Sequence, residues 1–233
     1  MSPLVSIIVP ALNEEATIQE LLGRLIALPF EKEILVVNDG STDGTARILD
    51  SFGSQIVVLT NPQRGGKGNA IRQALKVAQG EIVVIQDADL EYFPEDLPAL
   101  IAPFADAKVQ VVYGSRFSRG LIAGMALPNK LVNLMLVWAV QILFGKRLTD
   151  EATCYKAVRR STMQGMDLQC QRFEFCPEVT AKALRLGHDI LEIPIRYQPR
   201  SKKAGKKIRF SDAPEAFLTL WKYRRWRPKI GTN

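Results

Sequence analysis

The sequence predicts an α/β protein in which helices flank a mostly parallel central sheet. Short, continuously apolar strand patterns alternate with helical patterns through the first half of the chain, and such strands are typical of parallel sheets that are buried on both faces. A polar cluster directly follows nearly every one of these strand patterns. Because ligands of parallel sheets bind at the carboxyl ends of the strands, we expect these clusters to form a single site.

The first half of the chain contains five expected strands that are rich in β-branched residues: 5–10, 33–39, 55–61, 81–87 and 109–116. The segments between them have apolar residues at helical spacing or carry helix-start and helix-stop residues. These expected helices are 13–28, with Asn13 as its cap, 43–52, 66–80, which Gly80 closes, and 94–106, with Pro94 near its start.

The pattern changes beyond residue 116. The expected elements there are an apolar helix, a candidate strand, a helix, a second strand, a basic loop and a final helix: 128–144, 149–160, 173–187, 189–200, 201–212 and 213–226. No stretch of the sequence marks a boundary between independent domains. We therefore expect one integrated domain with a site-bearing half, 1–118, and a C-terminal extension, 119–233.

The chain is basic, with a net charge of +7 and an isoelectric point near 9.4. A basic balance favours an anionic partner, such as nucleic acid, an anionic membrane surface or a phosphorylated molecule. The sequence has neither zinc-finger spacing nor an aromatic RNA-binding motif, so we do not expect it to bind nucleic acid.

The cysteines and the apolar segments indicate the cellular compartment in which the protein is expected. Cys154, Cys170 and Cys176 form no CxxC pair, which argues against a zinc site or a disulfide framework. No basic segment precedes the first strand, so we expect no signal peptide. The longest apolar run, 131–144, falls short of the about 20 residues that a spanning helix needs. These features predict a cytoplasmic protein.

A cluster of carboxylates follows the fourth expected strand. Asp87 and Asp89 are two residues apart, and Glu91 follows. Carboxylate oxygens are ligands for Mg²⁺ or Mn²⁺, which often bridge to substrate phosphates. Such a pair also occurs as a helix cap with a solvated turn. Because it follows an apolar strand and shares its edge with four other polar clusters, we favour a metal site.

Two glycine-containing clusters leave alternatives open. Asp39, in 38–45, is placed to accept hydrogen bonds from a nucleotide base, but the cluster also has the composition of a turn. The segment 64–70 opens a helix whose backbone N–H groups are candidates for binding phosphate. Its spacing differs from that of a Walker loop, and a plain glycine-rich turn is the alternative.

Three basic or apolar segments of the second half indicate a surface role. The basic run 200–209 is either a solvated face or a loop that closes over a diphosphate. The apolar helix 128–144 and the tail 221–229, which mixes aromatic and basic residues, favour peripheral membrane contact over a core helix and a solvated terminus. His188 is the only histidine, and we expect it in a surface loop.

Taken in order, "SIIVPALNE", "VVNDGSTDGT", "GGKGNAIR", "DADLEYFPED", "GSRF", "LTDEATCYK", "FEFCPEVTAKAL" and "IPIRYQPRSKKAGKKI" resemble a family-2 glycosyltransferase of the branch that contains the dolichol-phosphate mannose synthases. The resemblance extends to about residue 225. It implies a GT-A fold, a nucleotide-sugar donor and inversion at the anomeric carbon. It also implies that 1–118 binds the nucleotide sugar and that 119–233 binds the acceptor.

The resemblance further implies roles for single residues. Those expected to bind the nucleotide sugar are Pro10, Asn13, Glu14, Asp39, Gly40, Arg64, Gly66, Lys67, Asp87, Ala88, Asp89 and Arg200. Those expected to hold Mg²⁺ or Mn²⁺ are Asp87, Asp89 and Glu91. Those expected to take part in catalysis are Asp89, Arg116, which binds phosphate, Asp150, on the acceptor side, and Glu178.

The expected reaction moves a hexose from a UDP- or GDP-sugar to a polyprenyl phosphate. A phosphate acceptor is already anionic and needs positioning rather than a general base. A hydroxyl acceptor on a soluble sugar or a protein is the alternative, and it requires a base, with Glu178, Glu174 or Asp150 as candidates. A sugar nucleotidyltransferase and a non-catalytic nucleotide-binding or membrane-binding module are the remaining alternatives.

Overall fold

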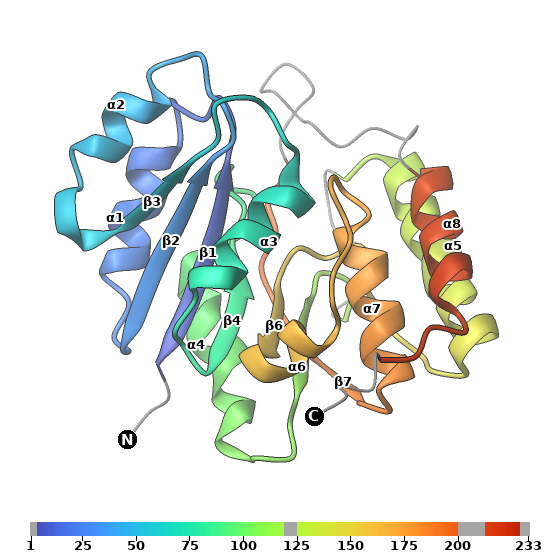
Figure 1. Cartoon of the computed structure of the whole chain (residues 1–233). Helices are drawn as coiled ribbons and strands as arrows, with labels where there is room; N and C mark the ends of the chain where they lie inside the picture. Colours follow the sequence, from blue (N-terminus) through green and yellow to red (C-terminus); the bar gives the residue numbers. More distant parts are fainter. Residues whose placement is uncertain (1–3, 119–124, 200–212, 229–233) are drawn as a thin grey trace.

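A computed structural model describes residues 4–118, 125–199 and 213–228. Its centre is a seven-stranded sheet with the strand order β3-β2-β1-β4-β6-β5-β7 (Figure 1). The strands are β1 (Val5–Ala11), β2 (Lys32–Asn38), β3 (Val57–Thr60), β4 (Ile82–Ile85), β5 (Val111–Ser115), β6 (Lys156–Arg159) and β7 (Ile190–Pro194).

The sheet is mostly parallel, as the sequence predicted. Strands β1 to β4 pair in parallel, β5 and β7 pair in parallel, and β6 runs antiparallel to both β4 and β5. The carboxyl ends of six strands therefore lie along one edge. Because β6 comes from the second half of the chain and lies between two strands of the first half, the two halves share one sheet.

The helices pack around this sheet (Figure 1). They are α1 (Ile18–Ile26), α2 (Thr45–Asp50), α3 (Lys67–Val77), α4 (Leu97–Ile101), α5 (Leu127–Phe144), α6 (Arg160–Gly165), α7 (Phe175–Arg185) and α8 (Ala213–Tyr223). Short 3₁₀ turns cover Gly53–Gln55, Pro94–Asp96 and Ala102–Ala105. Helices α5 and α8 lie side by side at the end of the molecule away from α1 and α2.

The apolar residues whose spacing predicted the helices and strands form the core of the protein. On α1, four residues at helical spacing are all fully buried: Ile18, Leu21, Leu22 and Leu25. The β4 strand has four apolar residues in a row, and all of them are buried as well. Full burial of one such side chain contributes about 1.5–3 kcal/mol, so these positions strongly favour this arrangement of helix and sheet.

Two helical expectations of the sequence are corrected. Asn13 does not cap α1: it has φ of 51° and lies five residues before Ile18. Its backbone N–H and side-chain oxygen instead bond Ser41 and Thr42, which ties the loop after β1 to the loop after β2. The expected helix over 94–106 is broken into α4 and two 3₁₀ turns, because its three prolines lack the N–H that a continuous helix needs.

Helix α5 has 18 residues and, judged by length and composition alone, is apolar enough to cross a membrane. Only 17% of it is buried within the protein. The buried residues Asn133, Leu136 and Val140 face inward, whereas Leu127 and Ile142 are 78% and 80% exposed. The alternative of a purely internal core helix therefore does not hold for this segment.

Candidate active site

A cavity of about 450 Å³ opens at the carboxyl edge of the sheet. The sequence-predicted residues that line it are Pro10, Glu14, Asp39, Arg64, Gly66, Lys67, Asp87, Ala88, Asp89, Glu91 and Arg116. They come from the segments after β1, β2, β3, β4 and β5. The structure thus brings together the polar clusters that the sequence placed at the strand ends.

Four predicted site residues do not line this cavity. Asn13 and Gly40 belong to the loops that support it, while Asp150 and Glu178 lie fully buried behind it. Gly40 has φ of 75°, and a Cβ there would lie 2.9 Å from the Arg64 backbone nitrogen, so it allows two loops to pack closely. Arg200 and the basic run 200–209 lie outside the described residues.

Asp39 organises the glycine-rich loop that precedes α3. Its carboxylate accepts hydrogen bonds from the backbone N–H groups of Gly65 and Gly66, at 2.8 and 2.7 Å, and from the Asn61 side chain at 2.8 Å. Gly66 has φ of 94°, and a Cβ would lie 2.4 Å from the Gln171 carbonyl oxygen. A larger residue does not fit at Gly66, because its side chain would collide with the segment before α7.

The backbone N–H groups of this loop are already used, which changes the expectation that they bind phosphate. Asp39 takes two of them, and the carbonyl oxygens of Arg172 and Gln171 accept hydrogen bonds from Gly68 and Asn69 at 3.0 Å. The N-terminus of α3 is therefore covered by the segment before α7. The charged residues with which this turn lines the cavity are Arg64 and Lys67.

Lys67 forms an ion pair across the cavity wall. Its Nζ lies 2.5 Å from Asp87 Oδ1 and 3.2 Å from Cys154 Sγ. Burial disfavours the ammonium charge, but the surrounding groups, Asp87 first among them, together outweigh burial and raise the pKa of Lys67. Burial, together with Asp87, also raises the pKa of the Cys154 thiol, so Cys154 is a neutral neighbour. The sequence did not single out Cys154.

The turn that carries Asp89 and Glu91 is strained. Leu90, between them, has φ of 59°, a left-handed conformation that costs a non-glycine residue free energy. Asp89 Oδ1 accepts the Glu91 backbone N–H at 3.1 Å, and Tyr197 donates its hydroxyl to Glu91 Oε2 at 2.6 Å. This turn has both acidic residues at the cavity.

The site suits a cation that is shared with a ligand. Among the residues that the structure describes, no group of three or more histidine, cysteine or acidic side chains forms a metal cage. Asp87 nevertheless already binds a cation, the Lys67 ammonium, at the cavity wall. Mg²⁺ typically takes one or two carboxylates and completes its coordination with phosphate and water. Asp87 and Asp89 fit that donor set.

Arg116 is held in place by Asp150. Its backbone N–H, Nε and Nη2 all donate to the Asp150 carboxylate, at 2.7 to 3.0 Å, and its side chain is 10% exposed. The guanidinium also lies 5.0 Å from the centre of the Tyr197 ring. Burial opposes the guanidinium charge, but Asp150 together with the neighbouring Tyr92 and Tyr197 outweighs it and raises the pKa of Arg116. Asp150 is thus a positioning group for Arg116.

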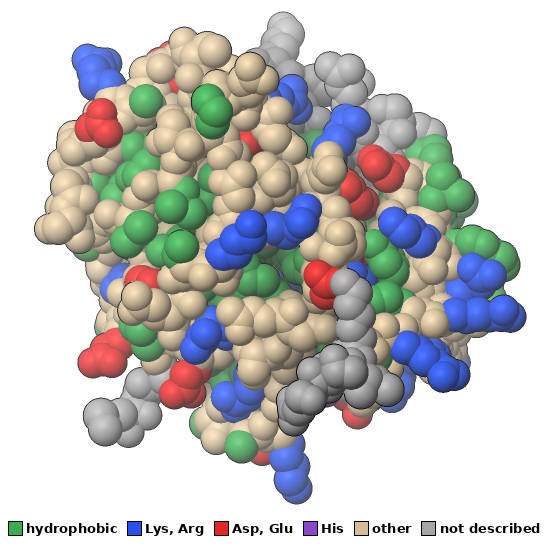
Figure 2. Space-filling model, in the orientation of Figure 1, with side chains coloured by type: hydrophobic (Ala, Val, Ile, Leu, Met, Phe, Trp, Pro, Cys, Tyr) green, Lys and Arg blue, Asp and Glu red, His purple; other side chains and the backbone are tan. Residues whose placement is uncertain are grey.

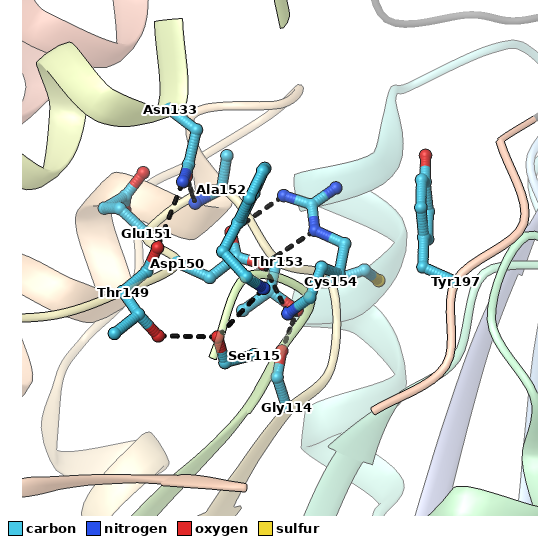
Figure 3. A network of polar contacts seen from close by, with 12 residues as sticks. Gly114, Ser115, Asn133, Thr149, Asp150, Glu151, Ala152, Thr153, Cys154 and Tyr197 are labelled. Atoms are coloured by element: carbon cyan, nitrogen blue, oxygen red, sulfur yellow. Dashed lines mark hydrogen bonds and ion pairs between the residues drawn. The ribbon is translucent and has the colours of Figure 1, made fainter. Parts of the chain in front are cut away.

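Figure 3 shows the network that orients Asp150. The Thr149 hydroxyl bonds Ser115 at the end of β5, and the Asn133 amide donates to the Thr149 carbonyl oxygen. Asn133 Oδ1 also accepts the Ala152 backbone N–H at 3.2 Å. This network joins α5, β5 and the segment before β6, so the position of Arg116 depends on all three.

Glu178, a predicted catalytic residue, has a structural environment. Its two oxygens accept hydrogen bonds from the backbone N–H groups of Gln169 and Cys170, and it pairs with Lys182 at 2.5 Å. Its side chain has no exposed area. Glu174, the other candidate base, lines the cavity but caps the N–H groups of Gln171 and Arg172.

Sequence reasoning missed Glu151, which lines the cavity and is fully buried. Glu151 Oε1 accepts a hydrogen bond from Thr180, and Oε2 has no hydrogen-bond partner among the described residues. Burial raises the pKa of Glu151. Tyr92 and Tyr197, which also line the cavity, were missed too. Glu151 and Tyr92 are close in sequence to Asp150 and Asp89, and the sequence carried no signal for Tyr197.

The fold and the acidic site define an α/β protein of the GT-A class. The family model described as "Glycosyl transferase family 2" matches residues 6–162. The chain belongs to this family, as the resemblance predicted.

Curated relatives of the chain have names that include a lipid phosphate, undecaprenyl phosphate. An undecaprenyl-phosphate 4-deoxy-4-formamido-L-arabinose transferase of Pseudomonas fluorescens (strain SBW25) is 34% identical over 181 residues, which cover 74% of this chain and 52% of that protein. The corresponding protein of Klebsiella pneumoniae is 30% identical over 225 residues, which cover 93% and 64%. The chain thus spans between half and two thirds of the length of these relatives.

Solved structures share the fold. Glucosyl-3-phosphoglycerate synthase from Mycobacterium tuberculosis, in complex with Mn²⁺, UDP and glucosyl-3-phosphoglycerate, has a TM-score of 0.72 at 22% identity, covering 98% of this chain and 82% of that one. Its complex with phosphoglyceric acid has a TM-score of 0.73 at 23% identity, with the same coverage. At this identity the comparison shows the fold, and the predicted GT-A architecture is confirmed.

Proposed function

We propose that the protein is a metal-dependent inverting glycosyltransferase that moves a hexose from a UDP- or GDP-sugar to a polyprenyl phosphate. The observation that supports this most directly is the convergence of Asp87, Asp89, Lys67 and Arg116 on one cavity at the carboxyl edge of the sheet. Two carboxylates and two cations in one cavity fit a metal-bound diphosphate and a second anionic group.

The reaction exchanges one bond for another at the anomeric carbon. An acceptor phosphate oxygen forms a bond to that carbon from one face, and the bond to the nucleoside diphosphate breaks on the other. A divalent cation held by Asp87 and Asp89 supplies charge stabilisation to the leaving diphosphate. Lys67 binds the same anion, and Arg116, fixed by Asp150, binds the acceptor phosphate. Arg200, which follows β7, is proposed as a further phosphate ligand.

The acidic residues of the second half support an acceptor that is already ionised. A hydroxyl acceptor requires a general base, but Asp150 is paired with Arg116, Glu178 is buried behind the cavity, and Glu174 caps two backbone N–H groups. None of the three predicted bases is placed to accept a proton. A phosphate acceptor needs no proton removed, and the lipid-linked names of the relatives agree with it.

The apolar wall of the cavity supports a lipid. Its apolar members are Met125, then Val132 and Leu136 of α5, and Ala213 and Ala216 of α8, and they lie next to the amides Asn129 and Asn133. The opposite faces of these helices expose Trp138, Ile142, Leu218 and Trp221. Figure 2 shows hydrophobic and basic side chains side by side at this end of the molecule. We propose that this face makes peripheral contact with an anionic membrane, which keeps the lipid tail out of water.

Transfer to a lipid phosphate is tested with purified protein and undecaprenyl phosphate in vesicles. A panel of UDP- and GDP-sugars is supplied with Mn²⁺ or Mg²⁺, and the lipid product is analysed by mass spectrometry and NMR. We expect one donor to give a glycosyl phospholipid with inverted anomeric configuration. Asp89→Asn should reduce turnover by about 10²-fold or more, because charge stabilisation of that order is lost.

The matched control is Asp50→Asn, which changes an exposed carboxylate on α2 and should retain full turnover. Unchanged turnover of Asp89→Asn would remove the metal assignment. Sugar transfer to a soluble hydroxyl in the absence of lipid would show that the acceptor is not a polyprenyl phosphate. Release of pyrophosphate from a nucleoside triphosphate and a sugar phosphate would show that the protein is a sugar nucleotidyltransferase.

A further inference from the structure

We infer that Lys67 takes the place of the divalent cation at Asp87 while the donor is absent and transfers to the donor's diphosphate when it binds, so that metal binding depends on the nucleotide. This inference rests on the proposed function. It concerns the order and coupling of binding rather than the reaction. Lys67 is thereby a positioning residue that makes the metal site complete only in the presence of the donor.

The first step is the geometry of the pair. Lys67 is the first residue of α3 and Asp87 follows β4 by two positions, so the ion pair joins two separate elements at the cavity wall. The two side chains are 13% and 19% exposed. Asp87 is the only ion-pair partner of Lys67 in the described part of the chain, and Cys154, at 3.2 Å from Nζ, is a neutral thiol.

The second step is competition for one carboxylate. A divalent cation binds a carboxylate oxygen at about 2.0–2.6 Å, and the Lys67 ammonium already contacts Asp87 Oδ1 at a similar distance. If the metal ion and the Lys67 ammonium both occupied that position, they would repel each other strongly, because the site is partly buried. A metal ion that arrives alone must therefore displace Lys67 from Asp87, its ion-pair partner in the described structure, before any diphosphate is present to take the ammonium.

The third step is the alternative partner that the donor offers. A nucleoside diphosphate carries several negative charges, so its oxygens are ligands for the metal and an ion-pair partner for Lys67 at the same time. The backbone N–H groups of Gly65, Gly66, Gly68 and Asn69 are already bonded within the protein. The positive side chains of this turn, Arg64 and Lys67, both of which line the cavity, are therefore the groups with which it binds the diphosphate, and Lys67 is the one that now pairs with Asp87.

The fourth step is that a side-chain rotation is enough. Asp39 holds the backbone of the loop on one side, and the carbonyl oxygens of Gln171 and Arg172 hold the first turn of α3 on the other. The Lys67 backbone thus keeps its position. Its long, flexible side chain moves the charge from Asp87 to a diphosphate in the same cavity without any movement of α3.

The test measures Mn²⁺ binding directly, by electron paramagnetic resonance of unbound Mn²⁺, with and without UDP or GDP. For the natural protein we expect the nucleotide to tighten Mn²⁺ binding by about 5- to 150-fold, the usual range of coupling between sites. In Lys67→Met, Mn²⁺ alone should bind more tightly than in the natural protein. The coupling factor should shrink toward one, and nucleotide binding should weaken.

Two further variants locate the effect. Lys76→Met removes an exposed cation from the last turn of α3 and should leave the coupling unchanged. In the double variant Lys67→Met and Asp87→Asn, the gain in Mn²⁺ affinity should vanish, because it acts through that carboxylate. Thermal unfolding verifies that each variant is folded, and Lys67→Gln replaces Lys67→Met if the latter is not.

The outcomes separate this inference from the proposed function. If the natural protein binds both Mn²⁺ and nucleotide but Lys67→Met binds Mn²⁺ alone no more tightly, Lys67 is a plain phosphate ligand and the inference is wrong. If the natural protein binds neither UDP nor GDP in the presence of Mn²⁺, the proposed function fails and the inference fails with it.

Discussion

The surroundings of Glu151 could not be predicted from the sequence. It sits between Asp150, which pairs with Arg116, and Ala152, yet its own carboxyl group has one oxygen on Thr180 and one without a hydrogen-bond partner among the described residues. A buried carboxyl group without full hydrogen bonding favours its neutral form. Burial therefore raises the pKa of a carboxyl group at the cavity wall, which the sequence did not predict.

The pKa of Glu151 makes stability depend on pH. Burial raises that pKa above the usual 4.5, so between the two values the folded state binds the proton and the unfolded state does not. The free energy of unfolding must therefore fall as the pH rises through this window. Glu151→Gln keeps the shape without the ionisation, and we expect its stability relative to the natural protein to increase with pH.

Urea unfolding of both proteins at several pH values between about 4.5 and 8 measures this difference. The exposed Glu31→Gln serves as the control and should show no such trend. A constant difference between Glu151→Gln and the natural protein across the range would show that Glu151 keeps the same charge in both states.

At the scale of elements, α5 has apolar side chains on two opposite faces, one buried in the protein and one exposed. Leu136 and Val140 are buried in the protein, whereas Trp138 and Ile142 are 64% and 80% exposed. With α8 it forms a shallow apolar groove that also includes Phe217, Leu218 and Trp221. An exposed apolar surface flanked by basic residues is typical of a helix that lies in a membrane interface.

Removing apolar side chains from this face should weaken membrane binding. We expect the double variant Trp138→Ser and Ile142→Ser to lose about tenfold or more in affinity for vesicles of mixed phosphatidylcholine and phosphatidylglycerol, since each buried side chain contributes about 1.5–3 kcal/mol. Nucleotide binding should not change. Vesicle co-sedimentation measures the first quantity and calorimetry with UDP or GDP the second.

The control for this experiment is Val57→Ser with Val77→Ser, two apolar side chains that are 46% and 43% exposed on β3 and α3. This pair removes exposed apolar area from the edge strand β3 and from α3, both of which lie away from α5 in Figure 1. Equal vesicle binding by the two double variants would contradict the assignment of the α5–α8 face to the membrane.

At the scale of the whole molecule, the cavity joins the two halves of the chain. Its walls come from the strand ends of the first half and from α5, α7 and α8 of the second, and β6 ties the halves through the sheet. A ligand in this cavity therefore contacts both halves. Because ligands that bind only the folded state stabilise it, donor and metal should stabilise the entire domain in one step.

We expect UDP or GDP together with Mn²⁺ to raise the melting temperature by about 5–10 °C at 100 times the dissociation constant, where stabilisation is about 2.7 kcal/mol. Mn²⁺ alone should raise it far less, and excess EDTA should abolish the gain from the nucleotide. Differential scanning fluorimetry measures all three. Full stabilisation by a nucleotide in EDTA would speak against a shared metal site.

Much of the fold could be predicted from the sequence, because its signals are local. Continuous apolar strands such as 82–85 and the helical spacing of Ile18, Leu21 and Leu25 follow from the periods of strand and helix. Polar clusters after parallel strands must meet at one edge, so the convergence of Asp39, Asp87 and their neighbours was predictable too. The ordered motifs likewise identified the family.

Only the tertiary structure decided which of these polar groups face the cavity and which hold it in shape. Asp150 and Glu178 are carboxylates in motif-like positions, but their partners Arg116 and Lys182 make them structural, and the N–H groups of α3 are covered by a segment about 100 residues away. Such contacts join residues far apart in the chain, and no local period records them. The chain by itself thus determined the sheet, its edge and the kinds of groups that gather there, whereas packing between distant segments determined which charges remain available to a ligand.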